Sequence, residues 1–226
     1  KLKANGLSPS PKASRRVLIR RMYLVLTGLL PTYDEVQMFE KDKRPDAMDR
    51  WIEKLLADAS YGKKWGRHWL DVARYADAKG YVDGGEATNP FAYTYRDYVV
   101  DAFNQDKPYD QFILEQIAAD RLDNAGEDTS ALAGLGFLTV GSRFNFFPDE
   151  IIDDRIDVVT RGFLGLTVAC ARCHDHKYDP VSAEDYYSLY GIFANSQEPT
   201  PDTFPVLNHH GLNAEKSLAK EVKEAA

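Results

Sequence analysis

Apolar side chains recur along most of this chain with the 3.6-residue period of an amphipathic α-helix, whereas the alternation typical of a β-strand is never sustained beyond a few residues. The pattern therefore predicts a mainly helical protein. Helices are expected over residues 15–27, after Thr32, over 46–60, 63–78 and 94–103, from 108, over 150–167 and after Ser182.

Polar residues with N-cap chemistry precede three of these helices: Ser14, the pair Thr32 and Glu35, and the pair Ser182 and Asp185. Both pairs have the spacing of a capping box, in which each side chain accepts a hydrogen bond from the backbone N–H of the other residue. These signals locate helix starts more closely than the apolar period does.

Segments without helical period are expected to be loops. Tyr61-Gly62 is expected to end the third helix, and residues 79–90 combine glycines with acidic residues over a length that suggests a functional role. A polar loop is expected at 124–130. The aromatic loop at 144–148 would be costly to leave in water, so we expect it to cover something.

The whole pattern indicates a single helical domain with long irregular loops. Residues 1–13, which are rich in proline and poor in apolar groups, are expected to form an extended lead-in, and the domain itself spans 14–198. Residues 199–226 are predicted to be a linker or tail, because their charged, helix-prone end has no apolar stripe.

Composition and charge narrow the class of partner. An apolar content of 44% is ordinary for a globular protein with a core, and the formal net charge of −7 argues against binding of nucleic acid or of an anionic membrane surface. The longest apolar run, 17–30, is interrupted by Arg20 and Arg21 and is too short to span a bilayer. An electron-transfer or small-molecule partner fits this excess of negative charge better.

The two cysteines of the chain lie in the run Cys-Ala-Arg-Cys-His at 170–174. Attachment of haem c needs two thiols that add to the vinyl groups of the porphyrin and an imidazole placed under the iron, and a spacing of two residues satisfies both needs. Cys170 and Cys173 would form the thioethers and His174 would bind iron through Nε2. The motif therefore predicts one covalent haem c.

Three other interpretations of the motif remain open. Zinc could be held by Cys170, Cys173, His174 and His176, although structural zinc usually takes two ligands from each of two separated elements. A thioredoxin-like redox pair would need a βαβ setting, which the pattern lacks. The third interpretation is a pair of buried free thiols beside a surface histidine.

A second axial ligand would have to come from elsewhere, because His176 cannot reach the opposite face of the same haem. His68 is the preferred candidate, since it lies between Trp65 and Trp69 on the apolar face of a predicted helix. The alternative is a core histidine hydrogen-bonded to Asp71 or Asp77. Weaker candidates are His209, His210, Met22, Met38 and Met48.

The two propionates of a haem would need donors such as Arg, Lys or Tyr. Arg172 lies inside the motif, and Arg74 and Tyr75 share a predicted helix with His68. We therefore predict that these three residues contribute to cofactor binding. Lys177, Arg155 and Arg161 are further cations near the motif.

Three stretches of the chain resemble the planctomycete-type cytochrome c domain family. They are GKKWGRHWLDVARYAD at 62–77, NQDKPYD at 104–110 and CARCHDHKYDP at 170–180. The resemblance runs over about 15–198, which is most of the chain, while residues 89–91 and the tail match less well. It implies that the positions from His68 to Asp71 and from Ala73 to Asp77 belong to a haem pocket or active site.

The resemblance also implies a setting. Such a domain usually lies in the middle of a large exported protein, so the chain is expected to be an excised middle domain from a periplasmic or extracellular protein, with flanking domains as partners. A redox protein or a polysaccharide-related substrate would be a further partner.

Three functional hypotheses follow. The first is an electron-transfer module whose iron has two protein ligands, His174 and His68. The second is a haem enzyme with an open distal site, where His68, Arg74, Tyr75 or Asp77 would assist peroxide or carbohydrate-linked redox chemistry. The third is a zinc or interaction module without haem.

Overall fold

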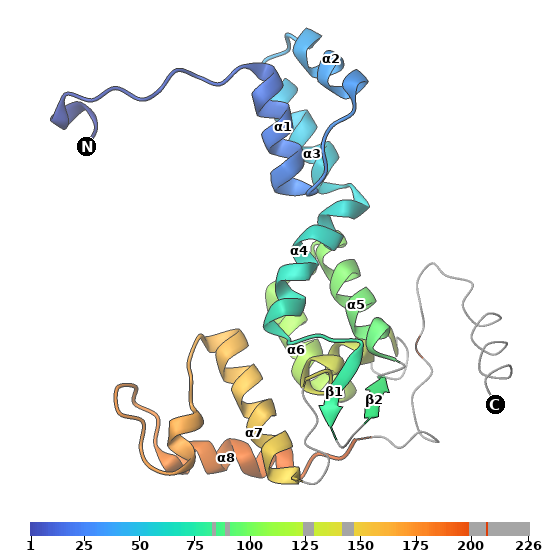
Figure 1. Cartoon of the computed structure of the whole chain (residues 1–226), viewed down its shortest axis with the longest axis vertical. Helices are drawn as coiled ribbons and strands as arrows, with labels where there is room; N and C mark the ends of the chain where they lie inside the picture. The colour runs from blue at the N-terminus through green and yellow to red at the C-terminus, as the bar shows by residue number, and fades with distance from the viewer. Residues whose placement is uncertain (83–84, 89–90, 124–128, 142–146, 199–206, 208–226) are drawn as a thin grey trace, which may run out of the picture.

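The computed structural model describes residues 1–82, 85–88, 91–123, 129–141, 147–198 and 207, and helices dominate this part of the chain (Figure 1). The mainly helical fold expected from the sequence is confirmed. The α-helices are α1 (Arg15–Leu26), α2 (Tyr33–Lys41), α3 (Ala47–Leu56), α4 (Ala59–Val72), α5 (Ala92–Asn104), α6 (Tyr109–Ala118), α7 (Pro148–Val159) and α8 (Ala183–Ala194). The 3-10 helices are η1 (Lys3–Asn5), η2 (Ala119–Arg121), η3 (Thr129–Leu138) and η5 (Ala169–Arg172), and η4 (Thr160–Leu164) is a π turn.

Helices α1, α2 and α3 form a unit with its own apolar cluster at one end of the molecule (Figure 1). The predicted caps are confirmed: Ser14 accepts a hydrogen bond from the backbone N–H of Val17, and Thr32 and Glu35 form both bonds of a capping box. The buried members of the cluster are Ile19, Met22, Tyr23, Phe39, Ala47 and Leu55.

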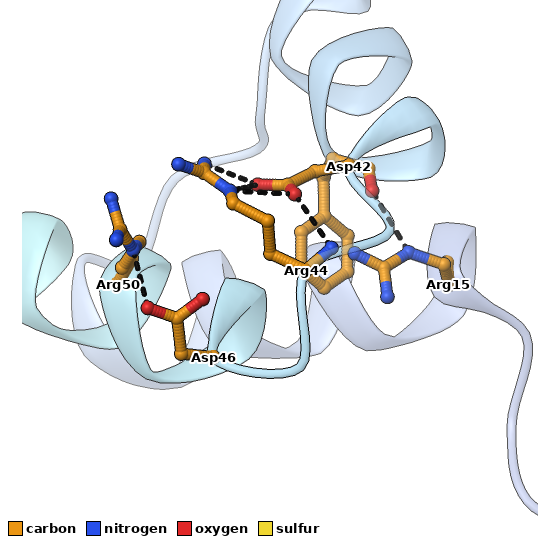
Figure 2. Close-up of polar contacts among 6 residues, drawn as sticks. Arg15, Asp42, Arg44, Asp46 and Arg50 are labelled. Atoms are coloured by element: carbon orange, nitrogen blue, oxygen red, sulfur yellow. Dashed lines mark hydrogen bonds and ion pairs between the residues drawn. The ribbon is translucent and has the colours of Figure 1, made fainter.

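Arg15 joins the start of α1 to the end of α2 (Figure 2). Its Nε donates a hydrogen bond of 2.8 Å to the carbonyl oxygen of Phe39, and its guanidinium lies 4.1 Å from the centre of the Phe39 ring. That carbonyl is among those at a helix C-terminus that lack a partner within the helix. Arg15 thus supplies an external cap for α2.

Helix α4 packs closely on α5 because two of its buried residues are glycines, Gly62 and Gly66. A Cβ on Gly62 would lie 2.4 Å from the carbonyl oxygen of Val100 and 2.6 Å from the side chain of Asn104. The expectation that Tyr61-Gly62 ends a helix is wrong, because this glycine provides a close approach between helices. The preceding helix, α3, ends earlier, at Leu56.

Left-handed backbone conformations follow two other helices. The helix expected over 63–78 already ends at Val72, and Arg74 adopts a φ of 58°, which a right-handed helix does not allow. The helix expected over 150–167 runs as α7 to Val159 and continues as the π turn η4. It stops at Gly165, whose φ is 67°, in the usual manner of a glycine after a helix.

The central apolar cluster is built around Trp69 of α4. Its indole stacks on Phe137 and contacts Phe163, with ring centres 5.8 and 5.7 Å apart. Its Nε1 donates to the side-chain oxygen of Gln116 at 2.7 Å, and the hydroxyl of Tyr95 donates to the same oxygen. The buried polar groups at this centre therefore satisfy one another.

Two short strands replace part of the loop expected at 79–90, so that expectation is wrong. β1 (Ala78–Val82) pairs antiparallel with β2 (Gly85–Thr88), and Val82 lies opposite Gly85. The two residues between these partners are Asp83 and Gly84, a dipeptide that strongly favours a two-residue hairpin.

The third cluster joins α7 and α8, and the predicted capping box of Ser182 and Asp185 is present at the start of α8. Its buried residues are Ile152, Ile156, Val168, Ala171, Tyr186 and Phe193. No helix in the described ranges is both long and apolar enough to cross a membrane. Most of the predicted loops at 124–130 and 144–148 lies outside the described residues, as do His209, His210 and nearly all of the predicted tail.

We predict that Gly62→Ala lowers the free energy of unfolding by about 1–3 kcal/mol, because the new methyl group overpacks the α4–α5 contact. Urea unfolding followed by circular dichroism measures the change. The matched control is Gly191→Ala in α8, where a Cβ meets nothing within 4 Å and the substitution should stabilise the helix by about 0.5–1 kcal/mol. Equal effects of the two substitutions would contradict this account of the packing.

The charge of Glu35 should make stability depend on pH. Burial raises the pKa of this carboxyl, but hydrogen bonds from Tyr23, Thr32 and Lys54 outweigh burial and lower the pKa from 4.5 to about 2. A carboxyl with a lowered folded-state pKa stabilises the fold above its ordinary pKa and loses that contribution as the pH falls.

We therefore expect wild type to be more stable than Glu35→Gln at pH 6, and the difference to shrink from about pH 4.5 towards pH 2. Thermal unfolding of both proteins across this range measures it. A difference that does not change with pH would show that the charge of Glu35 contributes nothing.

Candidate functional site

The Cys-Ala-Arg-Cys-His motif begins in the 3-10 turn η5 and leads into the loop between η5 and α8, in the orange part of the chain (Figure 1). The backbone N–H groups of Cys173 and His174 both point to the carbonyl oxygen of Cys170, at 3.3 and 3.4 Å. Both thiols are free and exposed, and His174 is exposed as well. The buried thiols of the third interpretation are therefore not found.

The loop after the motif is fixed to the start of α8. The Oδ1 atom of Asp175 accepts a hydrogen bond of 2.9 Å from the backbone N–H of Ala183, in the first turn of α8. The backbone N–H of His176 donates to the carbonyl oxygen of Val181 at 2.8 Å. The motif is thus held from its C-terminal side by a helix end that itself carries a capping box.

His176 organises the same loop with its side chain, which is only 9% exposed. Its Nδ1 accepts hydrogen bonds from the backbone N–H groups of Asp179 at 2.9 Å and Tyr178 at 3.4 Å. Because Nδ1 is an acceptor here, the neutral ring carries its proton on Nε2. His176 therefore supports the backbone that follows the motif.

Arg172, inside the motif, is paired with α7. Its Nη2 lies 2.9 Å from Oε1 of Glu150 and its Nη1 lies 3.8 Å from Oδ2 of Asp153, and the hydrogen bond to Glu150 raises the pKa of the guanidinium. Its carbonyl oxygen accepts a hydrogen bond of 3.1 Å from the Tyr187 hydroxyl. These contacts fix the motif to α7 and α8 together.

His174 has the geometry expected of a proximal ligand. Its Nδ1 lies 2.8 Å from the carbonyl oxygen of Asp175, a distance at which the ring donates its Nδ1 proton to that carbonyl. The lone pair is then on Nε2, and a hydrogen bond from the opposite nitrogen is the usual way in which proteins orient a ligating imidazole. Together with the two exposed thiols, this arrangement fits the requirements of a covalent haem.

His68 is exposed on α4, where its ring lies 5.6 Å from that of Trp65. The hydrogen bond to Asp71 or Asp77 considered from the sequence is not found: the Asp77 carboxylate accepts a hydrogen bond of 2.6 Å from the Tyr75 hydroxyl. No hydrogen bond or ring contact in the described part of the chain joins His68 to the motif. The structure therefore does not bring His68 and His174 together.

Arg74 and Tyr75, the other two predicted propionate partners, are also paired with carboxylates of the chain. Arg74 forms an ion pair with Asp154, whose pKa is raised by burial. The Nε and Nη2 atoms of Arg74 are buried and have no hydrogen-bond partner in the described part of the chain. Burial and the bond to Asp77 raise the pKa of Tyr75 to about 12. None of these contacts involves a residue of the motif.

The remaining candidates lie elsewhere. Met22 is buried in the cluster of α1–α3, and Met38 and Met48 are exposed on α2 and α3. Across the described residues, no three His, Cys, Asp or Glu side chains are grouped so that they could hold a metal ion. The four zinc ligands considered from the sequence are therefore not arranged around a common point.

Sequence reasoning missed Asp175 and His176 as the residues that hold the motif. Asp175 acts on Ala183, eight residues away, and the bonds of His176 depend on the turn at Tyr178 and Asp179. The available signal was the adjacent capping box, which places a helix start close behind the motif.

Fold and site together define a mainly helical domain with an exposed, anchored Cys-x-x-Cys-His loop. Over residues 1–198 the chain matches the family PSCyt2, described as a protein of unknown function (DUF1549), and it belongs to that family. The search of curated proteins found no match, and the search of solved structures found none either. The function of this family is not described, so membership in it assigns no function to the chain.

We predict that His176→Leu loosens the motif loop, whereas His176→Asn preserves it, because an Asn side-chain oxygen can take the place of Nδ1 as acceptor. Hydrogen exchange in the haem-free Cys170→Ser/Cys173→Ser protein measures the effect. Loss of this partly buried acceptor should speed exchange at the Asp179 amide about tenfold or more in the Leu variant. Exchange as slow as in the parent protein would contradict the role given to His176.

Proposed function

We propose that this domain binds one haem c through Cys170 and Cys173, with His174 as the proximal ligand, and that it transfers electrons within a larger exported protein. The observation that carries the proposal is the exposed loop in which both thiols are free and the Nδ1 of His174 is held by a backbone carbonyl. When bound, the haem supplies a one-electron couple at its iron.

The residues of the chain have distinct parts in this proposal. The thiols of Cys170 and Cys173 supply the two sulfur atoms for the thioether bonds, and His174 offers Nε2. Asp175 and His176 keep the loop in the conformation that presents these three groups. Arg172 ties the same loop to the carboxylates of α7, so it positions the motif in addition to being a predicted propionate partner.

The electron-transfer proposal includes a second axial ligand, for which His68 is the candidate. Its exposure on α4 leaves the imidazole free to bind a metal. A second function, a haem enzyme with an open distal site, is favoured by a different observation: His68 contacts Trp65, and no described contact joins it to the motif. The spin state of the iron distinguishes the two functions.

The test of haem attachment is expression of the domain together with a cytochrome c maturation system, followed by a pyridine haemochrome spectrum of the denatured protein. We expect one covalent haem per chain in wild type and none in Cys170→Ser/Cys173→Ser. If wild-type protein is folded by circular dichroism but carries no covalent haem, both haem hypotheses are wrong. The zinc or interaction module is then the hypothesis that remains.

The test of the sixth ligand is the visible spectrum of haem-loaded His68→Ala, with Arg67→Ala as the control at the neighbouring exposed position of α4. If His68 binds the iron, wild type and the control are low-spin and His68→Ala turns high-spin. An unchanged low-spin spectrum excludes His68. A wild-type spectrum that is already high-spin and changes on adding carbon monoxide supports the open-site enzyme.

A further inference from the structure

The charge of this chain is divided unevenly between its two ends. Residues 1–67 contain 15 Lys and Arg against 8 Asp and Glu, whereas residues 68–198 contain 10 against 23. The division falls inside α4. Residues 15–56, which hold α1–α3, contain 9 Lys and Arg against 7 Asp and Glu, so this unit has a small positive excess, whereas the rest of the described domain is acidic. The net charge of −7 therefore averages two parts of opposite sign.

The outer face of α1 combines free arginines with apolar side chains. Val17 and Leu24, both 39% exposed, are seven residues apart and so lie on one line along the helix, away from the buried face of Ile19 and Met22. Arg20 and Arg21 flank this line on its two sides.

Neither Arg20 nor Arg21 makes a side-chain hydrogen bond or ion pair within the described chain, although both are exposed. Other arginines of the same unit do have partners: Figure 2 shows Arg44 paired with Asp42 and Arg50 paired with Asp46. On the outer face of α1, two unpaired positive charges therefore lie next to exposed apolar side chains.

The outer face of α6 has the complementary composition. Leu114 is 52% exposed and Ile117 37% exposed, and with Asp110 they share one face because they follow at helical spacing. Asp106, just before the helix, is exposed too. In the described chain neither aspartate has a side-chain partner, so this apolar face has free negative charge at its start.

These two faces cannot meet within one molecule. Helix α1 lies in the terminal unit and packs on α2, α3 and the start of α4, whereas α6 lies in the middle of the molecule against η3 (Figure 1). Their apolar lines and opposite charges can be satisfied together only between different molecules.

We propose that the outer face of α1 is a docking surface for a second copy of this chain, which it contacts through the outer face of α6. The two surfaces differ, so the contact is head-to-tail and extends from copy to copy instead of closing a two-fold dimer. Two helix faces form a small interface, so the association is weak and sensitive to salt. It goes beyond the proposed redox function and does not depend on haem.

The test is sedimentation velocity of the haem-free domain over a range of concentrations, at low and high salt. We expect the average mass of wild type to rise with concentration at low salt, and Arg20→Glu/Arg21→Glu to weaken association about tenfold. Asp106→Lys/Asp110→Lys should do the same. Each variant presents like charge on both faces, so each alone should associate more weakly than wild type at every concentration.

A mixture of these two variants tests whether the two faces bind each other. In the mixture, the α1 face of each variant can pair with the oppositely charged α6 face of the other variant. Association that returns only in the mixture supports the proposal. If the Lys variant fails to fold by circular dichroism, Asp106→Asn/Asp110→Asn serves instead and should weaken self-association. Wild type that stays monomeric at every concentration overturns the proposal, as does binding of α1 only to vesicles of an anionic phospholipid.

Discussion

The close contact between α4 and α5 determines where the other parts of this molecule lie. Gly62 and Gly66 allow the two helices to approach, and the backbone N–H of Gly62 donates to the side-chain oxygen of Asn104 at 2.8 Å. Further along α4, Trp69 enters the central cluster and contacts Phe163 of η4. The chain leaves η4 only a few residues before the motif, so the α4–α5 contact also fixes where the Cys-x-x-Cys-His loop emerges.

The features that could be predicted from the sequence depend on residues close together in the chain. The capping boxes of Thr32 with Glu35 and Ser182 with Asp185 involve neighbours three apart, and both form as expected. The pairing of β1 with β2 is equally local, and the sequence Asp83-Gly84 is a strong turn signal, yet the glycine content of the segment favours a loop. In this segment the turn-forming dipeptide is a more specific signal than the overall glycine content.

The features that were missed depend on contacts between distant residues. Gly62 looks like a helix terminator until Val100 and Asn104 are known to lie against it. Arg74 looks like a free cation until Asp154, 80 residues away, is found beside it. The same limit applies to the candidate site: the 3-10 turn at Cys170 is encoded by adjacent residues, whereas the pairing of Arg172 with Glu150, which holds the motif against α7, joins distant ones.

The net charge of the whole chain likewise says little about where the charged side chains lie on the surface. A value of −7 indicates an acidic protein that avoids anionic partners, and this argument is sound only if charge is spread evenly over the surface. Once α1 is placed at one end of the molecule and α6 in its middle, the average no longer describes either surface. Partners are selected by the local field within about one Debye length, roughly 8–10 Å at physiological salt. The outer face of α1, with its unpaired arginines, and the acidic body that carries the motif therefore present different fields and can bind different surfaces.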